Sequence, residues 1–504
     1  MNLEYLEKIL TARVYDVADE TPLELAKGLS TRLRNQVLMK REDQQQVFSF
    51  KLRGAYNKIY NLSEEQRRAG VITASAGNHA QGVALAGSSL GVEAVIVMPE
   101  TTPEIKVAAV RGFGGKAVLV GDTYDEALAY ALDKAQEQGM TFVHPYDDPD
   151  VIAGQGAIGM EILRQHPDPI DAIFVPVGGG GLIAGIAAYV KSLRPEIKII
   201  AVEPEDTPTL ERALKAGERV VLDEVGLFAD GVAVRQIGKE TFRLAKSLVD
   251  DTVLVSTDEM CAAIKDIFEE ARTMMEPAGA LAIAGIKKYV AEKGVTDQTL
   301  VAINSGANIN FDRLRHVTER AEVGERREAL LAVTIPERPG SFCAFCSALG
   351  KRAITEFNYR YADHRDAQVF AGVRLSGGDE EKAKIIERLE SEGYAVTDLT
   401  DNELAKVHLR YLVGGHASSA ENEVLYRFLM PERPGALRDF LSALGSRWNI
   451  SLFHYRNHGS AHGRILAGIQ VPPDEREALK QSLARLGYQH WEESDNPAYR
   501  LFLG

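Results

Sequence analysis

Apolar and polar positions follow two alternating patterns along the first 312 residues. Short apolar runs bounded by turn residues predict buried parallel strands, clearest at residues 94–98, 116–120, 172–177 and 199–202. Helical stretches with start signals separate them, such as Thr102-Pro103-Glu104 and the capping-box spacings Thr123-Tyr124-Asp125-Glu126 and Ser256-Thr257-Asp258-Glu259. This alternation predicts an α/β fold with parallel sheets over residues 1–312.

The pattern changes beyond residue 312. Residues 313–328 are dense in charge and poor in apolar periodicity, which predicts a linker. The sequence then repeats: Ile335-Pro336-Glu337-Arg338-Pro339-Gly340 returns as Met430-Pro431-Glu432-Arg433-Pro434-Gly435. Each copy has the βαββαβ order of a ferredoxin-like α+β unit. We expect two tandem units, residues 329–412 and 413–504, with a ligand groove between them.

Composition mainly excludes functions. The 58 basic and 72 acidic residues give a net charge of −14, which argues against binding nucleic acid or an anionic membrane, because both need a basic stripe. The sequence has neither an apolar run of membrane-spanning length nor a signal pattern, so we expect a cytoplasmic protein. The pair Cys343-x-x-Cys346 lacks the second pair that a zinc site needs, and its apolar surroundings favour core packing.

One lysine stands at the start of a predicted helix, in Ser49-Phe50-Lys51-Leu52-Arg53-Gly54-Ala55. A hydrophobic pocket favours the neutral amine, and only the neutral amine attacks a carbonyl to form a Schiff base. The heptapeptide alone is more typical of an ordinary surface lysine. Its meaning therefore depends on the rest of the chain.

Three segments of small or amide side chains accompany predicted strands. The turn Thr73-Ala74-Ser75-Ala76-Gly77-Asn78-His79-Ala80-Gln81-Gly82 exposes backbone N–H groups at a helix start, which suits a carboxylate or phosphate. The four glycines in Val177-Gly178-Gly179-Gly180-Gly181-Leu182 favour an N–H nest around a phosphate, without the pattern of a P-loop or dinucleotide fingerprint. Ser305 follows the last strand. A lysine, a phosphate nest and a polar strand end together suggest pyridoxal phosphate.

These motifs, with Glu276-Pro277-Ala278-Gly279-Ala280 and Ser305-Gly306-Ala307-Asn308, resemble those of the two-lobed fold-type II pyridoxal-phosphate enzymes, the tryptophan-synthase β superfamily. With its tandem repeat, the whole chain is similar to the biosynthetic threonine dehydratases (threonine ammonia-lyases). The resemblance implies Lys51 as the Schiff-base lysine and catalytic base. It places the cofactor against Asn78, Gly178, Gly179, Gly180, Gly181, Leu182 and Ser305. It places the substrate carboxylate among Ser75, Ala76, Gly77 and His79.

The implied reaction is β-elimination of water from L-threonine, and also from L-serine, to give a 2-oxo acid and ammonia. For threonine the product is 2-oxobutanoate, and the reaction is the first committed step of isoleucine biosynthesis. The repeat resembles ACT-like regulatory domains, which implies inhibition by isoleucine and activation by valine. Gly435, Leu437 and Tyr455 are the expected effector contacts, and the resemblance also implies a homotetramer.

Other interpretations stay open from the sequence. They are a serine dehydratase, a racemase or a β-replacement enzyme of the same superfamily, and an amino-acid sensor with a vestigial catalytic half. Racemase-like relatives carry a carboxylate-lined metal site. The matching stretch here, residues 226–231, has apolar residues before Asp230, so we predict no metal there and leave a monovalent cation open.

Overall fold

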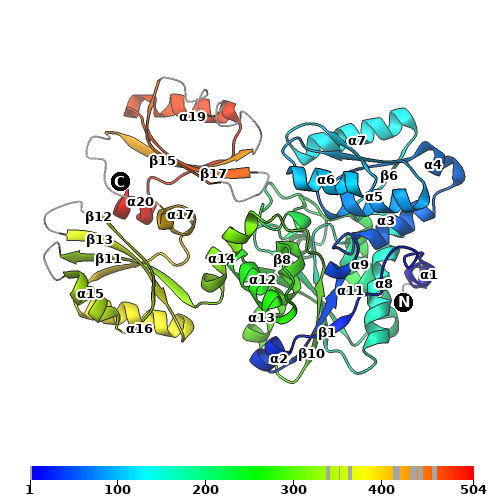
Figure 1. The fold of residues 1–504 in the computed structure, drawn as a ribbon, viewed down its shortest axis with the longest axis horizontal. Helices are drawn as coiled ribbons and strands as arrows, with labels where there is room; N and C mark the ends of the chain where they lie inside the picture. Colours follow the sequence, from blue (N-terminus) through cyan, green and yellow to red (C-terminus); the bar gives the residue numbers. More distant parts are fainter. Residues whose placement is uncertain are drawn as a thin grey trace. The chain divides into compact units, whose positions relative to one another are not determined.

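The fold is described from a computed structural model of the chain. It describes residues 3–336, 341–350, 352–360, 366–411, 421–431, 440, 447–456 and 462–503. The chain forms two compact units, residues 1–311 and 312–504, each considered separately below (Figure 1). Within the described ranges, no helix is both long and apolar enough to cross a membrane.

The first unit contains a six-stranded sheet in the order β1-β2-β10-β7-β8-β9. All neighbours are parallel except β1, which pairs antiparallel with β2. The strands are β1 (Leu23–Leu25), β2 (Gln36–Arg41), β7 (Ala172–Pro176), β8 (Lys198–Pro204), β9 (Asp251–Val255) and β10 (Thr299–Asn304).

The second lobe of this unit is built on a four-stranded parallel sheet in the order β5-β4-β3-β6. Helix α7 packs on one face, while α3, α5 and α6 contribute to the core on the other (Figure 1). The strands are β3 (Val71–Ala74), β4 (Ala94–Met98), β5 (Lys116–Leu119) and β6 (Thr141–Phe142).

The helices of the first unit cover both sheets. They are α1 (Leu3–Leu10), α2 (Lys27–Leu33), α3 (Lys51–Tyr60), α4 (Glu64–Ala69), α5 (Asn78–Leu90), α6 (Glu104–Gly112), α7 (Tyr124–Gln138), α8 (Pro149–Gln165), α9 (Gly181–Leu193), α10 (Thr209–Ala216), α11 (Lys239–Leu248), α12 (Thr257–Ala271) and α13 (Pro277–Lys293), with 3₁₀ turns η1 (Glu42–Gln44) and η2 (Asp230–Val232).

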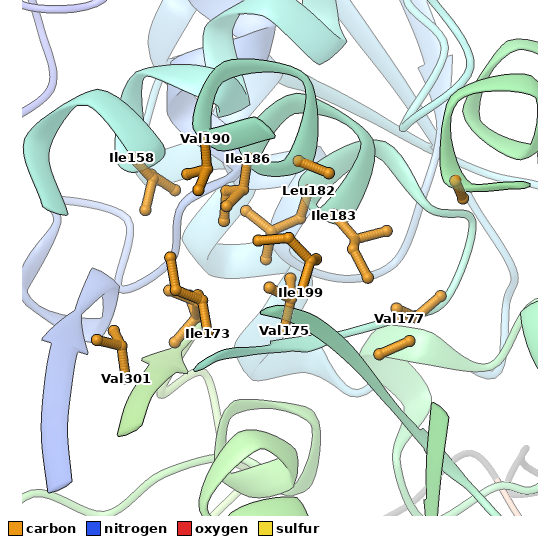
Figure 2. Packing of buried hydrophobic residues seen from close by; sticks show 14 of the residues in the cluster. Ile158, Ile173, Val175, Val177, Leu182, Ile183, Ile186, Val190, Ile199 and Val301 are labelled. Atoms are coloured by element: carbon orange, nitrogen blue, oxygen red, sulfur yellow. The ribbon is translucent and has the colours of Figure 1, made fainter. Parts of the chain in front are cut away.

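A buried apolar cluster fixes the end of β7, where the glycine-rich turn begins. Figure 2 shows Ile183 and Ile186 of α9 packing toward Ile173 and Val175 of β7. Ile199 of β8 joins the same cluster, and all five side chains are fully buried. This packing holds the start of α9 against the carboxyl ends of the parallel strands, which is where α/β sheets bind ligands.

The second unit holds two copies of a four-stranded antiparallel sheet, in the orders β12-β13-β11-β14 and β16-β17-β15-β18. Both orders are those of the ferredoxin-like arrangement that the repeat predicts. The strands are β11 (Glu328–Pro336), β12 (Ile354–Arg360), β13 (Asp366–Arg374), β14 (Ala395–Asp398), β15 (Glu423–Pro431), β16 (Asn449–Arg456), β17 (His462–Gln470) and β18 (His490–Glu492).

The helices of this unit are α14 (Arg313–Gly324), α15 (Ser341–Leu349), α16 (Gly378–Ser391), α17 (Glu403–Val407), α19 (Arg476–Leu486) and α20 (Pro497–Phe502), with 3₁₀ turns η3 (Leu409–Tyr411) and η4 (Pro473–Glu475). Helix α14 occupies most of the segment predicted as a linker. Leu330 and Phe370 of the first copy share a buried cluster with Leu425 and Leu466 of the second, so the copies pack together through apolar residues.

The expected core packing of the cysteine pair is wrong for Cys346. This thiol is exposed on α15, whereas its neighbour Phe345 is fully buried. Successive residues of a helix point about 100° apart, so an apolar run can turn one small side chain toward solvent.

Candidate active site

Lys51 is the first residue of α3, and its amine lines a cavity of about 810 Å³. Its Nζ donates a hydrogen bond to the Pro145 carbonyl at 2.9 Å and lies 5.3 Å from the centre of the Phe50 ring. Burial lowers the pKa of Lys51 to about 8, against the opposing effect of the Glu276 carboxylate. A substantial fraction of the Lys51 amine is therefore neutral near pH 7.5 and able to attack a carbonyl.

The cavity gathers every cofactor and substrate residue expected in the catalytic half. Its volume lies within the range of small-molecule sites and exceeds that of a single amino acid. The expected residues among its lining are Lys51, Ser75, Ala76, Gly77, Asn78, His79, Gly178, Gly179, Gly180, Gly181, Leu182 and Ser305.

Neighbouring atoms approach the four glycines too closely for larger residues to fit without a shift. A Cβ at Gly179 would lie 2.2 Å from the Tyr146 ring, and Gly180 adopts a φ of +90° that L-residues rarely take. Helix α9 starts at the fourth glycine, Gly181, so the N–H groups of its first turn lack intrahelical partners. This cradle of backbone donors at a positive helix end fits a phosphate group.

Asn78 begins α5 and is held by two other side chains. Its Nδ2 donates to Glu276 Oε1 at 2.5 Å, and its Oδ1 accepts from Asn308 Nδ2 at 2.7 Å. The sequence motifs contain Glu276 and Asn308 but predict no role for either residue. Their positions far along the chain gave no local signal that they would meet Asn78.

Ser305 lies buried at the carboxyl end of β10. Its hydroxyl donates to the Ala278 carbonyl at the start of α13, 3.3 Å away. The backbones of Gly279 and Gly306 approach each other closely here, because a Cβ at Gly279 would lie 2.0 Å from the Gly306 carbonyl oxygen. The motif Glu276-Pro277-Ala278-Gly279-Ala280 thus brings the start of α13 against the serine.

His79 is buried, and its Nε2 lies 3.0 Å from the Val143 carbonyl. Burial lowers the pKa of His79 to about 3, so the ring is neutral, with Nε2 carrying the proton toward that carbonyl. A neutral ring offers no charge to a substrate carboxylate. The backbone N–H groups at the start of α5 and the Ser75 hydroxyl, which lines the same cavity, are other donors in this turn.

The expected effector residues lie mostly beyond what the structure describes. Gly435 and Leu437 fall outside the described residues. Tyr455 lies on β16, and only its backbone is described. The part of the chain that is described holds no group of three or more His, Cys, Asp or Glu side chains suited to a metal ion, and the absence of a metal stays a prediction.

Family comparisons agree with this geometry. A family model described as a pyridoxal-phosphate-dependent enzyme matches residues 14–306. A second, described as the C-terminal regulatory domain of threonine dehydratase, matches residues 319–409 and again 414–503. The chain belongs to the threonine dehydratase family. The resemblance noted from the sequence is thereby confirmed, and the cofactor of this threonine dehydratase family member is pyridoxal phosphate.

Relatives in the family match over nearly the whole chain. A biosynthetic L-threonine dehydratase of Burkholderia multivorans is 59% identical over 503 residues, covering 99% of each chain. That of Escherichia coli is 55% identical, covering 99% of this chain and 97% of its own. The solved processed form of threonine deaminase isoform 2 from Solanum lycopersicum is 53% identical with a TM-score of 0.63. It covers 64% of this chain and 88% of that one.

Proposed function

We propose that this enzyme deaminates L-threonine to 2-oxobutanoate and ammonia by eliminating water, and that it also accepts L-serine. The observation that carries the proposal is the Lys51 amine, facing the same cavity as the tetraglycine cradle. Full-length relatives named biosynthetic threonine dehydratases at 55–59% identity support it. The reaction would be the first committed step of isoleucine biosynthesis.

Each group at the site has a part in this chemistry. Bound pyridoxal phosphate supplies an electron sink that acidifies the α-carbon of the amino acid. Lys51 Nζ would hold the cofactor by its aldehyde carbon, and the Lys51 amine would act as the base at the α-carbon of the substrate. The Pro145 carbonyl, 2.9 Å from that amine, orients it. The backbone donors of residues 178–182 hold the phosphate, and those of residues 75–79 hold the substrate carboxylate.

Asn78 and Ser305 would set the reaction type. Glu276 and Asn308 fix the Asn78 amide for a contact with the phenolic oxygen of the cofactor. The Ser305 hydroxyl would face the ring nitrogen. A hydroxyl does not hold a proton on that nitrogen as a carboxylate would, so the ring stays a weaker electron sink. Rapid loss of a β-hydroxyl is then favoured over transamination.

Lys51→Ala tests the proposal. This variant should lose the absorbance of lysine-bound cofactor, and its threonine turnover should fall by at least about 10²–10⁴-fold, because the base is gone. Lys58→Ala, on the same helix but ion-paired with Asp148, is the matched control and should keep both. Normal turnover in the Lys51 variant would disprove the assignment.

Product analysis separates the alternatives. Threonine and serine differ by one methyl group, which a pocket discriminates by about 10–200-fold, so both substrates are expected to react. A racemase would return D-serine instead of an oxo acid, and a vestigial sensor would return no product. Release of 2-oxobutanoate from threonine excludes both as the main activity.

We further infer the domain limits 1–312, 313–328, 329–412 and 413–504. The matched ranges 319–409 and 414–503 support the division between the two repeats. The tandem module would bind isoleucine as inhibitor and valine as activator, with Gly435, Leu437 and Tyr455 as contacts. Opposite effects require two global states with different affinity for each ligand. The homotetramer and the cytoplasmic location stay predictions.

A further inference from the structure

Two threonines hold the carbonyl groups of the tetraglycine turn. Thr209 Oγ1 lies 3.1 Å from the Gly178 carbonyl oxygen, and Thr241 Oγ1 donates to that of Gly179 at 2.7 Å. A trans peptide points its C=O and N–H in opposite directions. The N–H groups of Gly179 and Gly180 are therefore turned away from the threonines, toward the cavity that these glycines line.

Thr209 is in turn held by a buried carboxyl group. Glu203, in β8 beside β7, is fully buried. Its Oε1 lies 3.0 Å from Thr209 Oγ1 and accepts from the Leu210 N–H at 2.8 Å. Its Oε2 accepts from the Glu211 N–H at 2.9 Å. Glu203 thus fixes the start of α10 and the position of the Thr209 hydroxyl.

The available protons determine which groups donate and which accept in the hydrogen bonds from Glu203 through Thr209 to Gly178. The Thr209 hydroxyl has one proton, and the Gly178 carbonyl can only accept. All contacts are satisfied when Glu203 is protonated and donates to Thr209, which then donates to Gly178. Burial raises the pKa of Glu203 to about 7, with the α10 contacts opposing it and Glu211 adding repulsion, so a protonated form is accessible near neutral pH.

We propose that Glu203 and Thr209 are positioning residues for the cofactor phosphate, acting as a hydrogen-bond relay that fixes the Gly178–Gly179 peptide. Neither residue lines the cavity, so both act through the backbone donors of the turn. The proposal rests on the phosphate site assigned under the proposed function. The relay would position the phosphate site through residues of β8 and α10, which lie outside the cavity lining.

The test compares Thr209→Val with Thr209→Ser in the holoenzyme. Cofactor release is followed by absorbance after dilution into cofactor-free buffer. Valine keeps the shape but removes the hydroxyl, so release should be about 2- to 10-fold faster, as expected for one lost hydrogen bond. Serine should release at the wild-type rate, and the KM for threonine should be unchanged in both. Wild-type release from the valine variant would overturn the relay.

A control separates the relay from weakening of α10. Arg212→Gly lowers the helix propensity of α10 at an exposed position without touching the relay. It should release cofactor at the wild-type rate. Release as fast as in Thr209→Val would show that the helix, not the hydroxyl, matters, and would overturn the proposal.

The part of Glu203 is tested by a double-mutant cycle. If Glu203 acts through Thr209, Glu203→Leu, which cannot donate to the Thr209 hydroxyl, should speed release more in the wild-type background than in the Thr209→Val background. No change in the wild-type background, or an equal change in both, would remove Glu203 from the relay.

Gly179→Ala distinguishes failure of the relay from failure of the cofactor site. Its added Cβ meets the Tyr146 ring at 2.2 Å, so the cradle must shift and release should accelerate. Acceleration here without acceleration in Thr209→Val would defeat only the relay. Unchanged release in both would show that the phosphate does not lie on this turn, and the proposed site would fail with it.

Discussion

At the scale of single residues, the environment of Lys51 decides its chemistry. An ordinary lysine with a pKa near 10.4 has about one amine in a thousand neutral at pH 7.5. With the pKa lowered to about 8, roughly a quarter is neutral. The same sequence position with its side chain in water would be an inert cation, so burial rather than residue type supplies the nucleophile.

The lowered pKa of Lys51 predicts how covalent binding of the cofactor depends on pH. Because the amine is neutral above its pKa, the rate at which the apoenzyme binds pyridoxal phosphate covalently should rise with pH, with a midpoint near a pKa of about 8. Stopped-flow absorbance measures it. Pyridoxamine phosphate lacks the aldehyde, so its binding corrects for other titrating groups. A corrected midpoint near the ordinary lysine value of about 10.4 would show that Lys51 is not desolvated.

At the scale of elements, a second prediction concerns the turn between β3 and α5. A Cβ at Gly77 would meet no described atom within 4 Å, so Gly77→Ala should fold and retain cofactor. The methyl would enter the space expected for the substrate carboxylate, and overpacking of about 1–3 kcal/mol corresponds to a KM about 5- to 160-fold higher. Steady-state kinetics with threonine measure this change.

A matched substitution checks the location of that effect. Gly112→Ala also adds a Cβ with no described atom within 4 Å, at the end of α6 and outside the cavity lining. It should leave the KM unchanged. An unchanged KM in Gly77→Ala as well would place the substrate carboxylate elsewhere.

Elements with local signals were predictable from sequence. The run at residues 94–98 is β4, and the capping boxes at Thr123 and Ser256 start α7 and α12 with both reciprocal hydrogen bonds. The start signal at Thr102 did not produce a side-chain cap. Helix α6 begins at Glu104, and Pro103 occupies its N-cap position. A threonine–proline start signal does not by itself specify which residue forms the cap.

Sequence patterns did not predict the contacts between segments that lie far apart along the chain. The side chains that orient Asn78 come from positions 276 and 308. The hydrogen bonds from Glu203 through Thr209 to Gly178 join a strand, a helix start and a turn. Periodicity reports which face of an element is buried, but it does not identify the partner across the sheet. Motifs in the sequence therefore identified the candidate catalytic and cofactor-binding residues, and the structure identified the residues that position them.

At the scale of the whole molecule, the chain combines a catalytic unit with a duplicated one. Another solved threonine deaminase, from T.th., has 99% of its length matched by 62% of this chain, at 37% identity and a TM-score of 0.58. The matched share is close to the size of the catalytic unit. Each copy in the duplicated unit has its own buried apolar core, and effector binding is the role proposed for this unit.

Removing residues 312–504 tests that role, because the division between the units falls there. The shortened enzyme should still release 2-oxobutanoate from threonine, since every expected catalytic residue lies before the cut. Isoleucine should no longer inhibit it, because the state that isoleucine favours would be lost with its binding site. Initial rates with and without isoleucine measure this, and the full-length enzyme with added valine is the control for relief of inhibition. Inhibition that persists in the shortened enzyme would place the effector site in the catalytic unit.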